Sequence, residues 1–297
     1  MAEFTESELY NGKVKIKFFP VSHQYWVSVK GSSFKRKSGS TTLIGIMDKS
    51  KALGSWQQTM TADFLLDLIA KKVPITEDLA IEAVIQNDIA KDKAIDIGKA
   101  MHDWLEKYAK FKMKKGDMPE MPDIKEAING VNAFLQWESE HKVKYISCER
   151  VVYSIKGDYM GTLDLEAIVD GVHCLVDYKS SNGLYNSVRM QTASYVKADE
   201  EERGKKVYEG RWALRFSKYS ESEYMKREKR KKVLKEYIAR IKGKEWKDYP
   251  IPEYQVFETK FLDKEKDYMK DDYDAFTNAK ELYKWNAKTD WYNNPQY

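Results

Sequence analysis

The dipeptide Asp170-Gly171 lies between two stretches in which apolar and polar side chains alternate, residues 162–169 and 172–179. An Asp-Gly pair in this setting is the strongest short-range signal for a tight β-hairpin, because the favoured turn needs positive φ at both central residues. A two-residue loop also sets the register, so that Val169 pairs with Val172 and each cross-strand pair of residue numbers adds to 341. The sequence therefore predicts an antiparallel strand pair at this point.

This register places Asp164 opposite Asp177, and Thr162 opposite Lys179. Opposite side chains have Cβ atoms about 4.5–5.5 Å apart, and like charges at that separation are destabilising. A cation between the two carboxylates would remove the repulsion, and oxygen ligands of this kind suit Mg²⁺ or Mn²⁺. Lys179 projects from the same face toward the same place. The alternative is an amphipathic hairpin whose polar face is solvated and holds no metal.

Alternation divides the hairpin side chains between a core face and a polar face. The predicted core face carries Leu163, Leu165, Ala167, Val169, Val172, Cys174, Val176 and Tyr178. The predicted polar face carries Thr162, Asp164, Glu166, His173, Asp177 and Lys179. Glu166 and His173 lie toward the turn, so we expect them to remain outside a metal site.

The remaining patterns predict an α/β fold of mixed α+β type, with a central mixed sheet flanked by helices and a helical N-terminal part. Further strands are expected in residues 14–29 (a pair), 143–155, 207–217 and 254–261, with a loop at 30–40. Helices are expected at 52–70, 77–90, 94–111, 123–141, 184–203, 222–247 and 264–287. We expect one domain in four parts, namely an N-terminal hairpin and helices (1–141), the core (142–217), a basic helical insertion (218–250), and a C-terminal strand and helix (251–297).

Composition excludes several classes of protein. Two cysteines cannot build a four-cysteine zinc site or ligate an iron–sulfur cluster. No run approaches about 18 apolar residues, and the first residues lack the basic and apolar stretches of a signal peptide. We therefore expect a cytoplasmic protein with no membrane partner.

The residues around the hairpin resemble the PD-(D/E)XK nuclease superfamily. Asp164, in the run Gly161-Thr162-Leu163-Asp164, and the run Asp177-Tyr178-Lys179 are similar to the two core motifs of the superfamily, with Asp177 where Glu is commoner. The similarity covers about residues 40–217, and it is greatest to the RecB-like exonuclease branch, which includes phage-type exonucleases and the mitochondrial genome maintenance exonuclease.

Three further motifs resemble those of the RecB-like branch. Gln191 and Tyr195 are similar to its Gln-x-x-x-Tyr motif on the helix after the hairpin. His102, which follows Gly98 by one helical turn, resembles the histidine on an upstream helix, and the absent side chain at Gly98 would allow another element to approach closely. Glu149 resembles the acidic residue on the preceding strand.

The resemblance implies a restriction-endonuclease-like core and a deoxyribonuclease that uses one or two Mg²⁺ or Mn²⁺ ions. His102, Asp164, Asp177 and the backbone carbonyl of Tyr178 would be the metal ligands. Lys179 would position or deprotonate the attacking water and stabilise the developing charge, unless it forms only a structural ion pair. The implied partner is DNA, single- or double-stranded with a free end, together with a phage recombination or single-strand-binding protein in the host cytoplasm.

The supporting residues leave alternatives open. Gln191 would brace Lys179 or a metal-bound water, and Tyr195 would support it or contact DNA, unless the two are simply part of a core-facing stripe. Glu149 is an outer group of the metal site or the partner of Arg150 in a surface ion pair. For the whole protein, the alternatives are a structure-specific endonuclease of the same fold and a catalytically silent DNA-binding protein.

Two segments are candidates for DNA binding. Thr41 and Thr42 are expected near the start of a helix beginning around Leu43, where free backbone N–H groups bind phosphate or are merely capped. Residues 226–247 contain eleven Lys or Arg and three Glu, a balance of +8 within a chain whose net charge is +4. We expect an apolar face of that helix to dock on the protein while the cations face outward, either to contact phosphates or only to be solvated. The apolar face is Val233, Leu234, Tyr237, Ile238 and Ile241, and the named DNA-binding candidates are Lys229, Arg230, Lys231 and Lys232.

Overall fold

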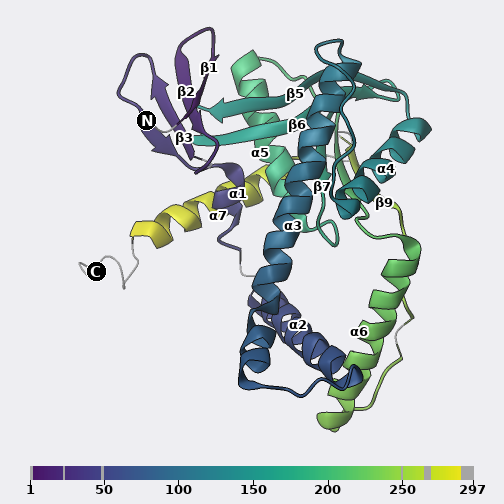
Figure 1. Ribbon diagram of the computed structural model, residues 1–297. Helices are drawn as coiled ribbons and strands as arrows, with labels where there is room; N and C mark the ends of the chain where they lie inside the picture. The colour runs from purple at the N-terminus through teal and green to yellow at the C-terminus, as the bar shows by residue number, and fades with distance from the viewer. Residues whose placement is uncertain (1–2, 23, 48–49, 249, 264–268, 289–297) are drawn as a thin grey trace.

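The computed structural model describes residues 3–22, 24–47, 50–248, 250–263 and 269–288, which form two β-sheets with helices around them (Figure 1). The larger sheet has the strand order β5-β6-β7-β8-β9. Its strands are β5 (Val143–Ser154), β6 (Tyr159–Val169), β7 (Val172–Lys179), β8 (Gly210–Phe216) and β9 (Phe257–Asp263). Because β7 and β8 are parallel and the other neighbours antiparallel, this is the mixed sheet flanked by helices that the sequence predicts.

β6 and β7 form the hairpin expected from the Asp-Gly dipeptide. Asp170 has a φ of 51° and Gly171 a φ of 87°, so both central residues of the turn have the positive φ that a tight hairpin needs. The predicted register is confirmed from the turn as far as Leu165 opposite Val176. The chain then returns through α5 (Asn186–Arg203) to β8, because a parallel neighbour requires a crossover connection.

Helices cover both faces of the larger sheet. On one face α3 (Glu77–Lys112) and α4 (Lys125–Glu140) form a core with β6, β7 and β8, in which Trp137 is fully buried. On the other face α5, α7 (Met269–Lys288) and the short α1 (Ser40–Ile44) form a second core. The sheet is therefore the middle layer of three.

The predicted division of hairpin side chains between two faces is confirmed for β6 from Leu165 to the turn and is wrong at Leu163. Leu163 packs in the core on the α5 side, whereas Leu165 packs in the core on the α3 side. Glu166 faces α5, where Arg203 donates hydrogen bonds of 2.9 and 2.8 Å to its two oxygens. Residues two apart on a regular strand share a face. The alternation of β6 therefore changes phase next to Asp164.

The smaller sheet is antiparallel and contains more strands than the sequence predicts. Its strands are β1 (Thr5–Leu9), β2 (Val14–Phe19), β3 (Gln24–Val29) and β4 (Lys35–Lys37), in that order. Only the β2–β3 pair was predictable, and the expected loop at 30–40 is wrong where β4 lies. The missed strands form both edges of this sheet, and neither carries the apolar alternation that marks a strand in a sequence.

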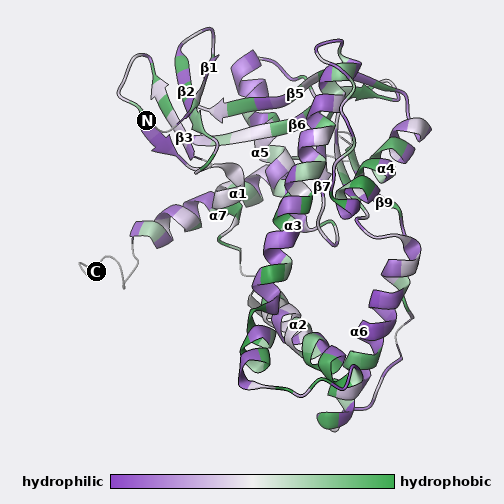
Figure 2. Cartoon of the chain, viewed as in Figure 1, coloured by the Kyte–Doolittle hydropathy of each residue, from purple (hydrophilic) through white to green (hydrophobic). Residues whose placement is uncertain are grey.

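Two long helices extend beyond the sheets. α2 (Ser50–Ala70) packs beside α3, and α3 is one continuous helix where two were predicted, because residues 91–93 contain no Gly or Pro that would end a helix. α6 (Glu221–Ile241) begins with a capping box at Ser220 and is largely hydrophilic along its length (Figure 2). In the described part of the chain, no helix combines the length and the hydropathy needed to cross a bilayer.

Candidate active site

Three potential metal ligands from three separate elements meet on the α3 side of the larger sheet. His102 lies on α3, Glu149 on β5 and Asp164 on β6, and one ligand atom from each lies within 4.8 Å of the other two. The Nδ1 atom of His102 lies 4.0 Å from Oδ1 of Asp164. Two carboxylates and an imidazole at this spacing form a donor set for a divalent cation.

An irregularity in β5 brings Glu149 into this cluster. Its φ is 47°, in the left-handed region that is uncommon for residues other than glycine, and β5 shifts register against β6 just before it. Such irregularities are frequent beside functional sites. The next residue, Arg150, binds Asp199 and Glu202 of α5 at 2.7 and 2.8 Å. The alternative ion pair between Glu149 and Arg150 is therefore not formed.

Asp164 and Asp177 lie at the point where the hairpin strands separate. β6 and β7 stop pairing one residue before them, and the Tyr178 N–H donates to Oδ2 of Asp164 at 2.7 Å. The buried carboxylate of Asp177 forms an ion pair with Nζ of Lys179 at 2.5 Å. The predicted register thus fails from this pair onward, including Thr162 opposite Lys179, and the Asp164 side chain accepts the hydrogen bond from the backbone of β7.

Burial and repulsion shift the protonation of the acidic groups. Burial raises the pKa of Glu149 to about 8, and the nearby charge of Asp164 adds to this effect. Burial also raises the pKa of Asp177 to about 6, with Lys179 opposing and Asp164 adding to the rise. Carboxyls in this site therefore hold protons at pH values where exposed acids are ionised, and a bound cation would take the place of those protons.

The residues fit a hard divalent cation. Both carboxylate oxygens of Asp177 are buried, and Oδ1 has no partner among the described residues while Oδ2 contacts Nζ of Lys179. Burial and the charge of Lys179 lower the pKa of His102 to about 4, so its imidazole is neutral and can donate a lone pair at neutral pH. The Tyr178 backbone hydrogen-bonds His102, and its carbonyl is therefore close to the predicted ligands.

Gln191 and Tyr195 lie on α5, which packs on the face of the larger sheet opposite α3. Nε2 of Gln191 donates to the Tyr195 hydroxyl at 2.8 Å. The Tyr195 ring lies so close to Gly161 that a Cβ added there would be 2.4 Å from it. Burial, followed by the charge of Asp177, raises the pKa of Tyr195. Tyr195 therefore belongs to the core and also neighbours the carboxylates, and Gln191 binds its hydroxyl.

A cavity of about 540 Å³ gives access to the cluster, and His102, Tyr178 and Lys179 are among its lining residues. Gly98 also lines it, and a Cβ added at Gly98 would lie 3.0 Å from Oγ of Ser180. The close approach expected at Gly98 is therefore present, and it involves the segment that follows β7.

The expected phosphate site at the start of α1 is not formed as predicted. α1 has five residues and begins at Ser40, with Gly39 as its N-cap, so Thr41 and Thr42 lie inside the helix and do not precede it. The Thr41 hydroxyl instead hydrogen-bonds Tyr195. The prediction of a helix beginning near Leu43 is wrong because the chain already turns at Gly39.

The basic helix α6 differs from its prediction in two respects. Three of its candidate DNA-binding cations form ion pairs within the chain, Arg230 with Asp63 of α2, Lys231 with Glu228, and Lys232 with Asp248. Lys229 has no ion pair among the described residues. The apolar face does not dock on the protein, since Leu234 is its one buried residue and Ile241 is 82% exposed.

Trp56 and Lys218 are among the cavity residues that the sequence did not predict. Trp56 of α2 and Lys218, just after β8, both line the cavity that contains His102 and Lys179. Neither residue belongs to a recognisable motif, and both reach the cavity only through tertiary packing. No signal in the sequence could have identified them.

The comparisons with known proteins assign no family, since no family model matches the chain and no curated protein matches it. Fold and site together therefore define the protein as a mixed α/β protein with a candidate divalent-metal centre. That centre comprises His102, Glu149 and Asp164, beside the ion pair of Asp177 with Lys179.

Proposed function

We propose that the protein is a Mg²⁺- or Mn²⁺-dependent deoxyribonuclease that hydrolyses phosphodiester bonds from the ends of DNA. The observation that carries the proposal is the meeting of His102, Glu149 and Asp164 beside the buried pair of Asp177 and Lys179. The motif resemblance to RecB-like exonucleases supports the same activity, and a helix-flanked mixed sheet is compatible with a restriction-endonuclease-like core. The proposed setting is phage recombination, repair or genome processing in the cytoplasm.

His102, Glu149 and Asp164 would hold the cation, with Asp177 and the Tyr178 carbonyl as further oxygen donors. Glu149 thereby becomes a direct ligand, where the sequence indicated an outer group. When bound, Mg²⁺ or Mn²⁺ supplies a Lewis acid for the phosphoryl oxygens and lowers the pKa of water. The carboxyls must give up their protons to bind it, so activity should rise with pH as Glu149 and Asp177 ionise.

Lys179 acts in this proposal as a fixed positive charge. Burial lowers its pKa, but the charges of Asp177 and Asp164 raise it more, so the side chain stays protonated. A protonated lysine cannot accept a proton from water. It orients the attacking water and stabilises the negative charge that develops on the phosphoryl oxygens. Of the two roles expected for Lys179, positioning is therefore favoured over deprotonation.

Nucleotide release from linear DNA tests the proposal. With Mg²⁺ or Mn²⁺ the protein should digest linear DNA, and it should leave linear DNA intact in EDTA and covalently closed circles intact throughout. Asp164→Asn should abolish release, whereas Asp117→Asn, at an exposed residue after α3, should not. Cleavage of closed circles would indicate an endonuclease, and no cleavage of any DNA would refute the proposed activity.

A further inference from the structure

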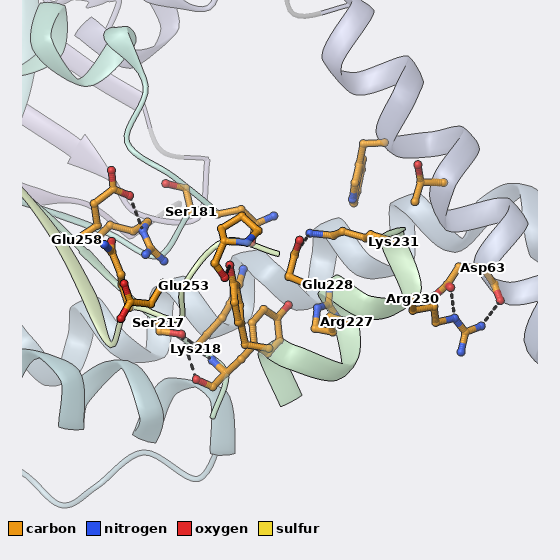
Figure 3. A pocket seen from close by; sticks show the side chains of 18 of the residues that line it. Asp63, Ser181, Ser217, Lys218, Arg227, Glu228, Arg230, Lys231, Glu253 and Glu258 are labelled. Carbon is orange, nitrogen blue, oxygen red and sulfur yellow. Dashed lines mark hydrogen bonds and ion pairs between the residues drawn. The ribbon is translucent and has the colours of Figure 1, made fainter. Parts of the chain in front are cut away.

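A second cavity, of about 580 Å³, adjoins the cavity that contains His102 and Lys179. It lies between α2, α6 and the end of β8, and Figure 3 shows its lining side chains. The two cavities share four lining residues, Trp56, Ser181, Asn182 and Lys218. A ligand that reaches the catalytic residues can therefore extend past this shared wall toward α6.

The charges of the second cavity are only partly balanced. Three of its five cations are paired within the chain, Arg215 with Glu258, Arg230 with Asp63, and Lys231 with Glu228. Lys218 and Arg227 have no ion-pair partner among the described residues. Among the described lining acids, the exposed Glu253 is the one without an ion pair. Two free cations thus remain inside the cavity.

Lys218 is buried, which is unusual for a cation without an ion pair. The residue is 8% exposed, and burial together with the charges of Arg227 and Arg215 lowers its pKa, while Glu126 opposes this. Its Nζ lies 6.0 Å from the centre of the Tyr219 ring, and the Arg227 guanidinium lies 4.4 Å from the same ring. A buried charge without a partner is costly. An anion bound between the two cations would offset that cost.

Aromatic side chains lie around the same cations. Trp56, Tyr219 and Tyr224 all line the second cavity, and Trp56 lines both cavities. Basic side chains that contact phosphates, interleaved with aromatic rings on which bases stack, are characteristic of sites for single-stranded nucleic acid. Bases can stack on such rings only when they are not paired in a duplex.

We propose that Lys218 and Arg227 form a phosphate-binding subsite for single-stranded DNA, with Trp56 as the ring on which a neighbouring base stacks. This inference rests on the proposed function, because it takes DNA to be the substrate. It adds the path of the strand, which runs from Lys179 past Lys218 into the cavity beside α6.

Binding of a labelled single-stranded oligonucleotide to the full chain in EDTA tests the subsite without any cleavage. Lys218→Met and Arg227→Gln should each flatten the slope of log affinity against log salt by about 0.7, which is about a fivefold loss at 0.1 M salt. Trp56→Ala should weaken binding about fivefold or more. The matched control is Lys235→Gln, at an exposed lysine of α6 outside the cavity, and it should have a smaller effect than either variant.

Thermal melting separates a binding role from a structural one. Lys218→Met removes a buried charge and keeps most of the aliphatic stem, so its melting temperature should equal or exceed that of the unsubstituted chain. Unchanged affinity and salt slope in both Lys218→Met and Arg227→Gln would overturn the subsite, as would tighter binding of duplex than of single strands.

Failure of the subsite is distinguishable from failure of the proposed activity. If the unsubstituted chain digests DNA and its Lys218 and Arg227 variants bind DNA normally, the subsite is refuted and the nuclease proposal stands. If the unsubstituted chain digests no DNA but those variants lose affinity for DNA, the subsite is supported and the nuclease proposal is refuted.

Discussion

Protonation of Glu149 should strongly affect the stability of the metal-free protein. Burial, the charge of Asp164 and then that of Glu106 raise its pKa to about 8, while Lys110 opposes them. One pKa unit corresponds to about 1.4 kcal/mol, so a rise from 4.5 to about 8 amounts to up to about 5 kcal/mol. Ionisation of Glu149 lowers the free energy of unfolding by this amount.

The sign of the pH dependence follows from the direction of the shift. The folded-state pKa of Glu149 exceeds its unfolded-state value. The contribution of protonated Glu149 to the free energy of unfolding is therefore fully present below pH 4.5 and is lost as the pH rises through 8. Glu149→Gln keeps the shape of the side chain and removes the titration. The variant should therefore be more stable than the unsubstituted chain by about 1 kcal/mol at pH 5 and by up to about 4–5 kcal/mol at pH 8.5.

Urea unfolding in EDTA, followed by circular dichroism at these two pH values, measures the difference. Glu120→Gln, at an exposed residue, should show no such dependence on pH. Mn²⁺ at 100 times its Kd should narrow the difference at pH 8.5, because it adds about 2.7 kcal/mol to a protein that binds it. A stability difference between Glu149→Gln and the unsubstituted chain that does not grow with pH would refute the reasoning.

Three further predictions concern the neighbours of the metal centre. Lys179→Ala should lower turnover about 10²-fold or more while DNA affinity in Ca²⁺ changes little, and equal losses in rate and affinity would make Lys179 a DNA-anchoring residue. Gly161→Ala should destabilise the protein by about 1–3 kcal/mol in urea unfolding, because its Cβ would lie 2.4 Å from the Tyr195 ring, and a neutral effect would contradict that packing. In NMR titrations of the metal-free protein His102 should titrate near pH 4, and a midpoint near 6.5 would show that neither desolvation nor the charge of Lys179 lowers its pKa.

The hairpin was predictable because its information is local. Asp170 and Gly171 set the turn, the turn sets the register, and the register holds over five residue pairs to Leu165 opposite Val176. The proximity of Lys179 to Asp177 also follows, because residues two apart on a strand share a face.

The exact arrangement of the site was not predictable, because it depends on departures from regular geometry. Alternation in β6 changes phase beside Asp164, and Glu149 adopts a left-handed backbone in the middle of a strand. Both features occur where β5 and α3 pack against β6, and a pattern of apolar residues does not predict them. The exposed apolar face of α6 shows the same limit, since helical spacing predicts a face but not what covers it.

The decisive test of the metal-dependent nuclease proposal compares the unsubstituted chain with Asp164→Asn. The quantity measured is the rate of nucleotide release from end-labelled linear DNA at saturating Mn²⁺. Asp164 lies in one cluster with His102 and Glu149 and accepts a hydrogen bond from the Tyr178 backbone of β7, so the proposed metal-dependent cleavage would require its charge. The account predicts rapid release by the unsubstituted chain and a loss of at least about 10²-fold in Asp164→Asn, with the fold retained. Release by Asp164→Asn at close to the unsubstituted rate would contradict it.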